Sequence, residues 1–183
     1  MKITRLEIPG AAVVEAIPFL DQRGSFSRLY CESELSDILG HRKILQINAS
    51  MTKTVGAIRG LHFQHSPKAE MKLVRCIRGQ VFDVLVDLRR ESPTFKKWHA
   101  EELSPENAKM MVIPEGCAHG FQVLLPDSEM LYLHTEFYSP EAGDRIRFDE
   151  PQFGITWPLE VTDLSDVDKN EPQLPADYEG LLL

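Results

Sequence analysis

The chain has few cysteines, no long apolar run and no excess of positive charge, and each shortage excludes a class of protein. Its three cysteines, Cys31, Cys76 and Cys117, are odd in number and widely spaced, which suits neither a disulfide framework nor a CxxC zinc site. No apolar run approaches the roughly 20 residues that cross a bilayer, and the first residues lack the apolar core of a signal peptide. We therefore expect no membrane partner and a cytoplasmic location.

Basic residues are in the minority. The chain carries 20 Lys and Arg against 28 Asp and Glu, which gives a formal net charge of −8. Because nucleic acids attract net positive surfaces, nucleic acid is not expected as a partner. An anionic small molecule would need a local group of basic side chains.

Internal repeats and Gly/Ser linkers are also missing, so the 183 residues are predicted to form a single domain over 1–183. The composition changes from about residue 165, where the chain becomes polar, acidic and proline-bearing. This segment is predicted to be an extended C-terminal tail. Two interpretations stay open: a passive surface tail, or a tail that contributes one functional residue.

Short strands separated by turn residues dominate the pattern, and helix is scarce. The predicted strands are Val13–Ile17, Ser27–Cys31, Ile44–Ser50, Lys72–Arg78, Gln80–Asp87, Lys96–Glu102, Lys109–Ile113, Gly120–Leu124 and Glu129–Phe137. A short helix is predicted over Glu32–Leu39, with Ser33 as N-cap and Gly40 at its end. So many short strands in a chain of this length predict an all-β fold, a double-sheet barrel or jelly roll with one or two short helices.

The densest group of reactive side chains is Arg59, His62, His65 and Lys72. In a strand, His62 shares a face with Gly60 and would point into the barrel or its mouth, with Leu61 on the other face. A lone histidine there is more often structural, but these cations in an acidic chain form a patch suited to phosphate or an enolate oxygen.

A second histidine, His119, follows a Pro and Gly turn and suggests two histidines on neighbouring strands. A rival interpretation is a metal-dependent cupin with His62, His65, Glu70 and His119 as ligands. The spacing argues against it, because residues three apart face opposite ways in a regular strand. We therefore predict no metal.

Ten motifs occur in order between about Asp21 and Asp168: DxRGxF, QxNxS, RGLHFQ, KLVRCIRG, VFDVLVDLR, SPTF, IPEGCAHGF, LYxxTxFYSP, GITWP and LSDVD. Together they resemble the dTDP-4-dehydrorhamnose 3,5-epimerase family. The resemblance implies a cupin-like jelly roll, a homodimer with an exchanged N-terminal strand, and an isomerase that uses no cofactor.

The resemblance also implies roles for individual residues. The implied catalytic residues are His62 as base, Asp168 as its partner, Tyr132 as acid on the other face of the sugar and Lys72 at the enolate oxygen. The implied substrate-binding residues are Arg59 and His119 at the diphosphate, Arg23 and Phe26 from the partner subunit, and Gln46, Asn48, Arg28 and Tyr138.

This set of side chains fits the chemistry that the resemblance implies. A ketone at sugar carbon 4 acidifies the hydrogens at carbons 3 and 5, so a base can remove one if the enolate is stabilised. The predicted function is therefore epimerisation of a nucleotide-linked 4-keto-6-deoxyhexose, by default the conversion of dTDP-4-dehydro-6-deoxyglucose to dTDP-4-dehydrorhamnose. Alternatives are a single-centre 3- or 5-epimerase and a sugar-nucleotide binding protein without catalysis.

Two positions depart from the family pattern. Arg28 stands where a glutamate is usual; a carboxylate accepts the imide proton of thymine, whereas a guanidinium only donates. A CDP-linked sugar is therefore an alternative substrate, unless Arg28 points to solvent or phosphate. Glu70 stands where many members have glutamine, beside Lys72, and its effect on the sugar or the lysine stays open.

Overall fold

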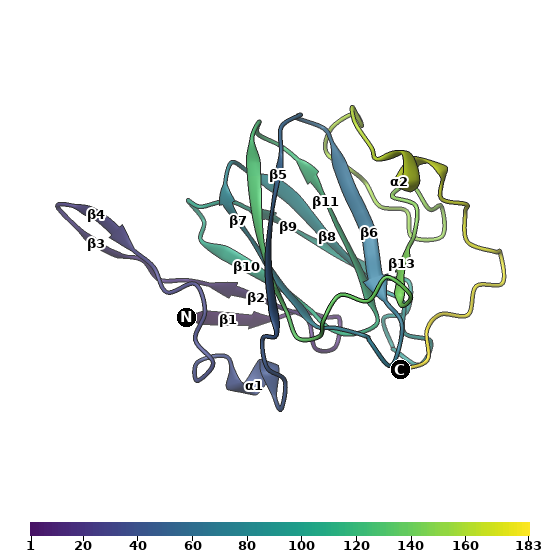
Figure 1. The fold of residues 1–183 in the computed structure, drawn as a ribbon, viewed down its shortest axis with the longest axis horizontal. Coiled ribbons are helices and arrows are strands. Elements are labelled where there is room, and N and C mark those ends of the chain that lie inside the picture. The colour runs from purple at the N-terminus through teal and green to yellow at the C-terminus, as the bar shows by residue number, and fades with distance from the viewer.

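The computed structural model describes residues 1–183, and most of its regular structure is β-strand (Figure 1). The strands are β1 (Lys2–Arg5), β2 (Ala12–Glu15), β3 (Phe19–Asp21), β4 (Gly24–Phe26), β5 (Gln46–Thr52), β6 (Ile58–Gln64), β7 (Lys72–Arg78), β8 (Val81–Asp87), β9 (Trp98–Leu103), β10 (Lys109–Ile113), β11 (Cys117–Val123), β12 (Ser128–His134) and β13 (Gly143–Arg145). The two helices are short, α1 (Ser36–Leu39) and α2 (Asp166–Asn170).

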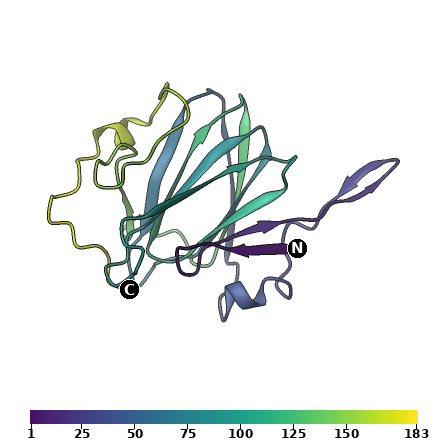
Figure 2. The same cartoon turned by 180° about the vertical axis from the view of Figure 1, so that it is seen from behind.

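Two antiparallel sheets form the body of the molecule. The six-stranded sheet has the order β1-β2-β10-β7-β12-β5, and the five-stranded sheet has the order β13-β6-β11-β8-β9. They pack face to face, as the two views in Figures 1 and 2 show. This arrangement is a cupin-like jelly roll, so the predicted all-β fold is confirmed.

The main core lies between the sheets. Alternate residues of β7, such as Val74 and Cys76, meet Leu85 of β8 and Phe121 of β11 there. The next residues of β8, Val84 and Val86, belong to a separate outer cluster. Strand β8 is therefore buried on both faces, which explains its nearly continuous apolar sequence.

Each sheet is also covered on its outside. Helix α1 places Ile38 and Leu39 on the outer face of the six-stranded sheet, against residues such as Leu73. The C-terminal segment covers the outer face of the five-stranded sheet, where Leu174 packs against the cluster that contains Leu61. Figure 1 shows this segment, in yellow, running along the side of β6 and β13.

Strands β6 and β11 approach unusually closely beside the two predicted histidines. A side chain at Gly60 would place its Cβ 2.6 Å from the Cα of Gly120, and Gly60 has a positive φ of 114°. The strand register changes between His119 and Phe121 at the same place. Only glycine fits such a contact, and the contact brings His62 opposite His119.

Strand ends shift by a few residues, strands such as β1 and β6 are added to the predicted ones, and two predicted elements differ more strongly. Ser27–Cys31 is not a strand; it connects the β3–β4 hairpin to α1 without a neighbouring strand to pair with. The helix begins at Ser36 instead of Glu32, after a turn, and its N-cap is Leu35, which makes no side-chain capping bond. Gly40 ends the helix as predicted, with a positive φ of 59°.

The β3–β4 hairpin projects away from both sheets (Figures 1 and 2). Its large apolar side chains are unusually open to solvent: Phe19 is 70% exposed, and Leu20 and Phe26 are each 73% exposed. Apolar side chains gathered in this way mark a surface for protein contact.

No helix in the chain is both long and apolar enough to cross a membrane.

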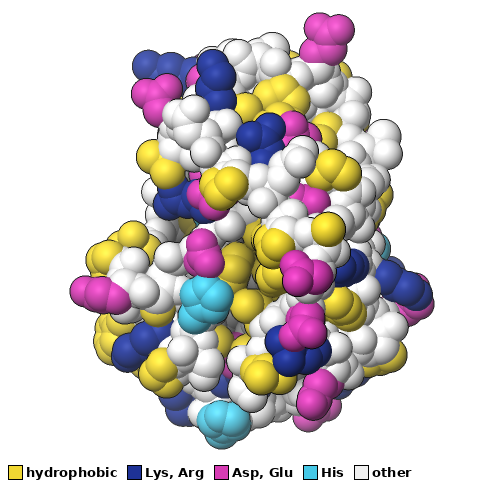
Figure 3. Space-filling model, turned by 90° about the vertical axis from the view of Figure 1, so that its right-hand side faces the viewer, with side chains coloured by type: hydrophobic (Ala, Val, Ile, Leu, Met, Phe, Trp, Pro, Cys, Tyr) yellow, Lys and Arg dark blue, Asp and Glu magenta, His cyan; other side chains and the backbone are white.

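On the face that carries the C-terminal segment, acidic and basic side chains are interspersed (Figure 3).

Candidate active site

A cavity of about 1050 Å³ opens between the two sheets. Strands of both sheets and the C-terminal segment contribute to its walls. The predicted site residues that line it are Asn48, Arg59, His62, Lys72, His119, Tyr132, Tyr138 and Asp168. The structure therefore brings most of the predicted site together in one place.

His62 and Asp168 form an imidazole–carboxylate pair at one wall. His62 lies on β6, and its Nε2 is 2.9 Å from Oδ1 of Asp168 on α2. The hydroxyl of Ser165 accepts a hydrogen bond from the Asp168 backbone N–H and so fixes the start of α2. The C-terminal segment thus contributes Asp168 to the wall of the cavity, and a functional role for this residue stays a prediction.

The Asp168 carboxylate is nearly buried, whereas the His62 side chain is 45% exposed toward the cavity. Burial alone raises the pKa of Asp168, but the hydrogen bond and charge of His62 outweigh it and hold that pKa below its ordinary value. The carboxylate therefore stays charged at neutral pH and can accept a hydrogen bond from the His62 ring.

The six-stranded sheet supplies Lys72 and Tyr132 to the same cavity. The Lys72 ammonium donates to the backbone carbonyl of His62 at 3.2 Å and lies 3.2 Å from a Glu70 carboxylate oxygen. Tyr132 shares a hydrogen bond with Ser50 across 2.8 Å. Burial raises the pKa of Tyr132 to about 12, so its hydroxyl keeps its proton at neutral pH and can serve as an acid.

Arg59 and His119 also line the cavity. The Arg59 Nε donates to the Thr52 hydroxyl at 2.8 Å, which anchors the guanidinium at the cavity. The buried His119 lies 2.7 Å from a carboxylate oxygen of Asp83. Burial raises the pKa of Asp83 in spite of this contact. Motif reasoning missed Asp83, because its contact with His119 depends on β8 and β11 being neighbours.

Four predicted binding residues lie outside this cavity. Gln46 lies at the edge of the cavity, where its side-chain oxygen accepts a hydrogen bond from the Tyr138 backbone N–H at 3.2 Å. Arg23 pairs with Asp21 on the projecting hairpin, and Phe26 lies at the end of β4. Arg28 is exposed and lies 2.6 Å from Glu34.

The comparisons with known proteins agree with this geometry. The family model for dTDP-4-dehydrorhamnose 3,5-epimerase matches residues 5–176. The chain therefore belongs to the dTDP-4-dehydrorhamnose 3,5-epimerase family. It is 41% identical over 180 residues to the enzyme of that name from Shigella flexneri, covering 97% of this chain and 99% of that protein. The Pseudomonas aeruginosa enzyme is 45% identical over 161 residues, 87% of this chain and 88% of the other.

Solved structures of the family share the fold. The Legionella pneumophila enzyme, solved with dTDP-4-keto-L-rhamnose, has a TM-score of 0.87 and 38% identity over 92% of this chain and 89% of its own. A 3'-monoepimerase from Streptomyces bikiniensis, solved with dTDP-quinovose, has a TM-score of 0.86 and 30% identity over 92% and 86%. This family member is accordingly an isomerase with a jelly-roll fold.

The rival metal-ligand set does not come together in this member of the family. The four side chains have separate partners: His62 pairs with Asp168, His65 with Asp144, Glu70 with Lys72 and His134, and His119 with Asp83. No three His, Cys, Asp or Glu side chains are grouped to hold a metal ion. One of these partners, His134, was not predicted as a site residue, although it lines the cavity.

Proposed function

We propose that the chain converts dTDP-4-dehydro-6-deoxyglucose to dTDP-4-dehydrorhamnose by inverting carbons 3 and 5. One observation carries this proposal: the His62–Asp168 pair shares a cavity with Lys72 and Tyr132, which come from the opposite sheet. A base, a proton donor and a cation are the groups that a ketone-assisted epimerisation needs.

In the proposed reaction, His62 removes the proton from carbon 3 or carbon 5 of the sugar. The electron pair of the broken C–H bond forms a C=C bond, and the carbonyl electrons move to oxygen 4. The Lys72 ammonium donates a hydrogen bond to that enolate oxygen. Asp168 stabilises the imidazolium that forms.

Tyr132 then delivers its proton to the same carbon from the other face, the carbonyl re-forms, and the configuration is inverted. Tyr132, whose pKa burial raises to about 12, is protonated at neutral pH and therefore has a proton to give. His62 passes its proton to solvent and Tyr132 is reprotonated, which restores both groups for the second carbon. No redox change occurs.

The nucleotide diphosphate is proposed to lie along the cationic side of the cavity. Arg59 and His119 would bind the phosphates, and Asn48, Gln46 and Tyr138 would line the nucleotide end. Such a local cluster is what an anionic ligand requires in a chain of net charge −8. The default base is thymine. Arg28 is exposed and paired with Glu34 in this chain, so its position gives no support to a CDP-linked sugar, which stays the alternative substrate to assay.

We further infer a homodimer in which the β3–β4 hairpin of each subunit reaches the cavity of the other. The hairpin's exposed Phe19, Leu20 and Phe26 support this arrangement, because the hairpin is a two-stranded sheet that pairs with neither sheet of its own barrel. Arg23 and Phe26 would then contact the nucleotide in the partner subunit. Three free cysteines, two of them buried, suit a reducing compartment, so we place the enzyme in the cytoplasm.

The product configuration tests the proposal. The chain is incubated with dTDP-4-dehydro-6-deoxyglucose, the keto group is reduced chemically, and the sugar is identified by its proton coupling constants. Rhamnose-configured sugar from the wild type and none from His62→Ala is the expected result. Inversion at carbon 3 alone would instead identify a monoepimerase, the activity of the similar Streptomyces bikiniensis enzyme.

A further inference from the structure

A second imidazole–carboxylate pair, formed by Glu70 and His134, lies in the same cavity. One Glu70 oxygen is 2.7 Å from Nδ1 of His134, and the other is 3.2 Å from the Lys72 ammonium. The side chains of Glu70, Lys72 and His134 are only 7%, 10% and 12% exposed. Glu70 thus bridges the lysine and the histidine in a nearly buried chain of three residues.

The backbone holds this chain in place. Lys72 and His134 are direct partners in the β7–β12 pairing, so their side chains project from neighbouring strands. The segment that carries Glu70 is attached to the end of β12: the Met71 N–H donates to the Thr135 hydroxyl at 2.9 Å, and the Thr135 N–H donates to the Met71 carbonyl at 3.1 Å.

The charges favour a fixed arrangement. Burial disfavours the charged form of Glu70, but the His134 hydrogen bond and the Lys72 charge outweigh it and lower the pKa of Glu70. The ionised Glu70 carboxylate therefore accepts a hydrogen bond from His134 and forms an ion pair with Lys72. A nearly buried carboxylate without partners has a large desolvation penalty, so the arrangement in which Lys72 and His134 contact Glu70 is favoured. The other acids that line the cavity are Asp144, Asp163 and Asp168. Asp168 pairs with His62 and Asp144 with His65, so Glu70 is the acid paired with Lys72.

We propose that Glu70 and His134 are positioning residues for Lys72: His134 orients Glu70, and Glu70 holds the ammonium at the place where the enolate oxygen forms. The inference rests on the proposed function, because a fixed ammonium matters only if charge develops next to it. Neither residue is proposed to exchange a proton with the sugar. Their effect is expected in the transition state and not in nucleotide binding.

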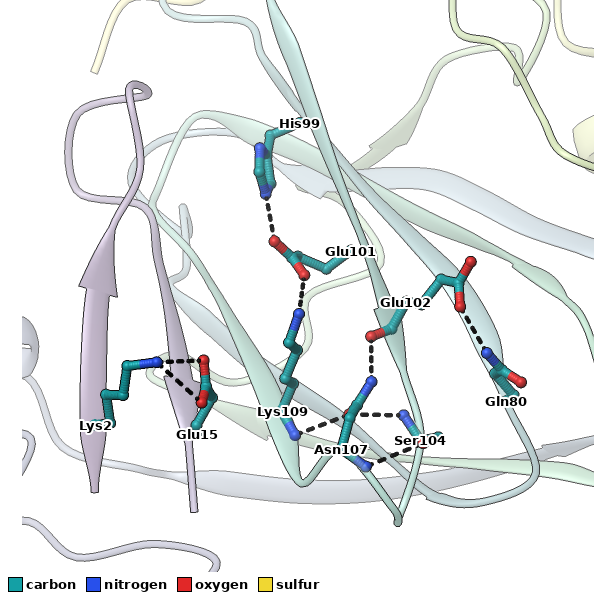
Figure 4. A network of polar contacts seen from close by, with 9 residues as sticks. All are labelled: Lys2, Glu15, Gln80, His99, Glu101, Glu102, Ser104, Asn107 and Lys109. Carbon is teal, nitrogen blue, oxygen red and sulfur yellow. Dashed lines mark hydrogen bonds and ion pairs between the residues drawn. The ribbon is translucent and has the colours of Figure 1, made fainter. Parts of the chain in front are cut away.

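The chain contains a matched control for this arrangement. Glu101 lies 2.7 Å from the Lys109 ammonium and 3.2 Å from Nε2 of His99, so it forms the same Lys–Glu–His chain on β9 and β10 (Figure 4). None of these three residues lines the cavity. Glu101→Gln therefore removes an equivalent carboxylate away from the site.

The test measures kcat, KM for the dTDP sugar and dTDP affinity in five proteins: wild type, Glu70→Gln, Glu70→Ala, His134→Ala and the control Glu101→Gln. Glu70→Ala leaves the ammonium with the His62 carbonyl alone, and a misplacement of about 1 Å is expected to lower kcat by about 10²-fold. KM and dTDP affinity are expected to stay within about twofold. Glu70→Gln keeps an oxygen for Lys72 and is expected to retain an intermediate kcat, whereas Glu101→Gln is expected to match the wild type.

A Glu70→Ala/His134→Ala double variant tests whether the two residues act as a unit. If they do, the double variant is no slower than Glu70→Ala alone. Three results would overturn the inference. The first is a double variant whose loss of kcat is the product of the two single losses, and the second is an unchanged kcat in Glu70→Ala. The third is a fall in kcat that occurs only together with a loss of dTDP binding. A wild type that does not epimerise the sugar refutes the proposed function itself, so the two failures are distinguishable.

Discussion

The Nε2 atom of His62 lies 2.9 Å from Oδ1 of Asp168, although the two residues are 106 positions apart in the chain. The contact joins a strand of the five-stranded sheet to a five-residue helix in the C-terminal segment. This segment also packs on the outer face of that sheet through residues such as Leu174 and Tyr178, so the same stretch of chain contributes to packing and to the wall of the cavity.

Asp168→Asn tests the contribution of this pair. The amide keeps the shape of the side chain but removes the charge that stabilises the protonated His62. We expect kcat to fall by about 10²-fold, in the range found for general acid–base groups, with a smaller change in KM. Steady-state assays on the dTDP sugar measure both. A variant with wild-type kcat would show that His62 works without the carboxylate.

Tyr132→Phe separates proton removal from inversion. The variant keeps His62 and the ring but loses the proposed acid, so deuterium from solvent should enter the recovered substrate while epimerised product forms at least about 10²-fold more slowly. NMR of the sugar follows exchange and configuration in one sample. Ser50→Ala, which removes only the hydrogen-bond partner of Tyr132, serves as control and should retain inversion. Normal inversion by Tyr132→Phe would contradict the assignment.

Mixing two inactive variants tests the exchanged hairpin. His62→Ala has a defective cavity and an intact hairpin. Arg23→Ala/Phe26→Ala has an intact cavity and a defective hairpin. If hairpins serve the partner's cavity, a mixed dimer contains one complete site, and denaturing and refolding the mixture should restore up to about a quarter of wild-type activity by random pairing. Recovery no greater than the sum of the separate variants would count against exchange.

Asp87 offers a pH-dependent test of stability. Its buried carboxylate accepts hydrogen bonds from Arg89, Ser92 and Thr94. Burial raises its pKa, but these bonds outweigh burial and leave the pKa below its ordinary value. A lowered pKa gives stabilisation that is complete above the unfolded value of about 3.9 and is lost as the pH falls through the folded value.

Asp87→Asn should therefore lower the free energy of unfolding by about 2 to 3 kcal/mol at pH 7, and the difference from wild type should shrink below about pH 4. Urea unfolding at a series of pH values measures this. Glu101→Gln, at a partly exposed carboxylate, is the comparison and should change stability by less than about 1 kcal/mol. A pH-independent difference for Asp87→Asn would show that the charge is not the source of stability.

Local patterns predicted much of the fold. Strands β7 and β10 begin and end at the predicted residues, and most of their residues are buried. Ser27–Cys31 was predicted wrongly, because the segment has strand-forming residues but no neighbouring strand. Strand β13 and the β3–β4 hairpin have only three residues per strand, too few for a clear period.

The site depended on motifs and on tertiary contacts. The family motifs indicated His62 and Asp168, and the structure brings them together, but no pattern near either residue shows that the C-terminal segment returns to β6. The partners Asp83 and His134 were missed for the same reason, since each meets its neighbour through sheet pairing. Arg23 and Phe26 remain predictions, because a single chain leaves them away from its own cavity.

Solvent deuterium incorporation tests the central claim most directly. The protein is incubated with dTDP-4-dehydro-6-deoxyglucose in D₂O, and deuterium at carbons 3 and 5 is followed by NMR, with His62→Ala as control. We expect deuterium at both carbons with the wild type and none above background with the variant. Deuterium at neither carbon, or equal exchange in His62→Ala, would contradict that claim.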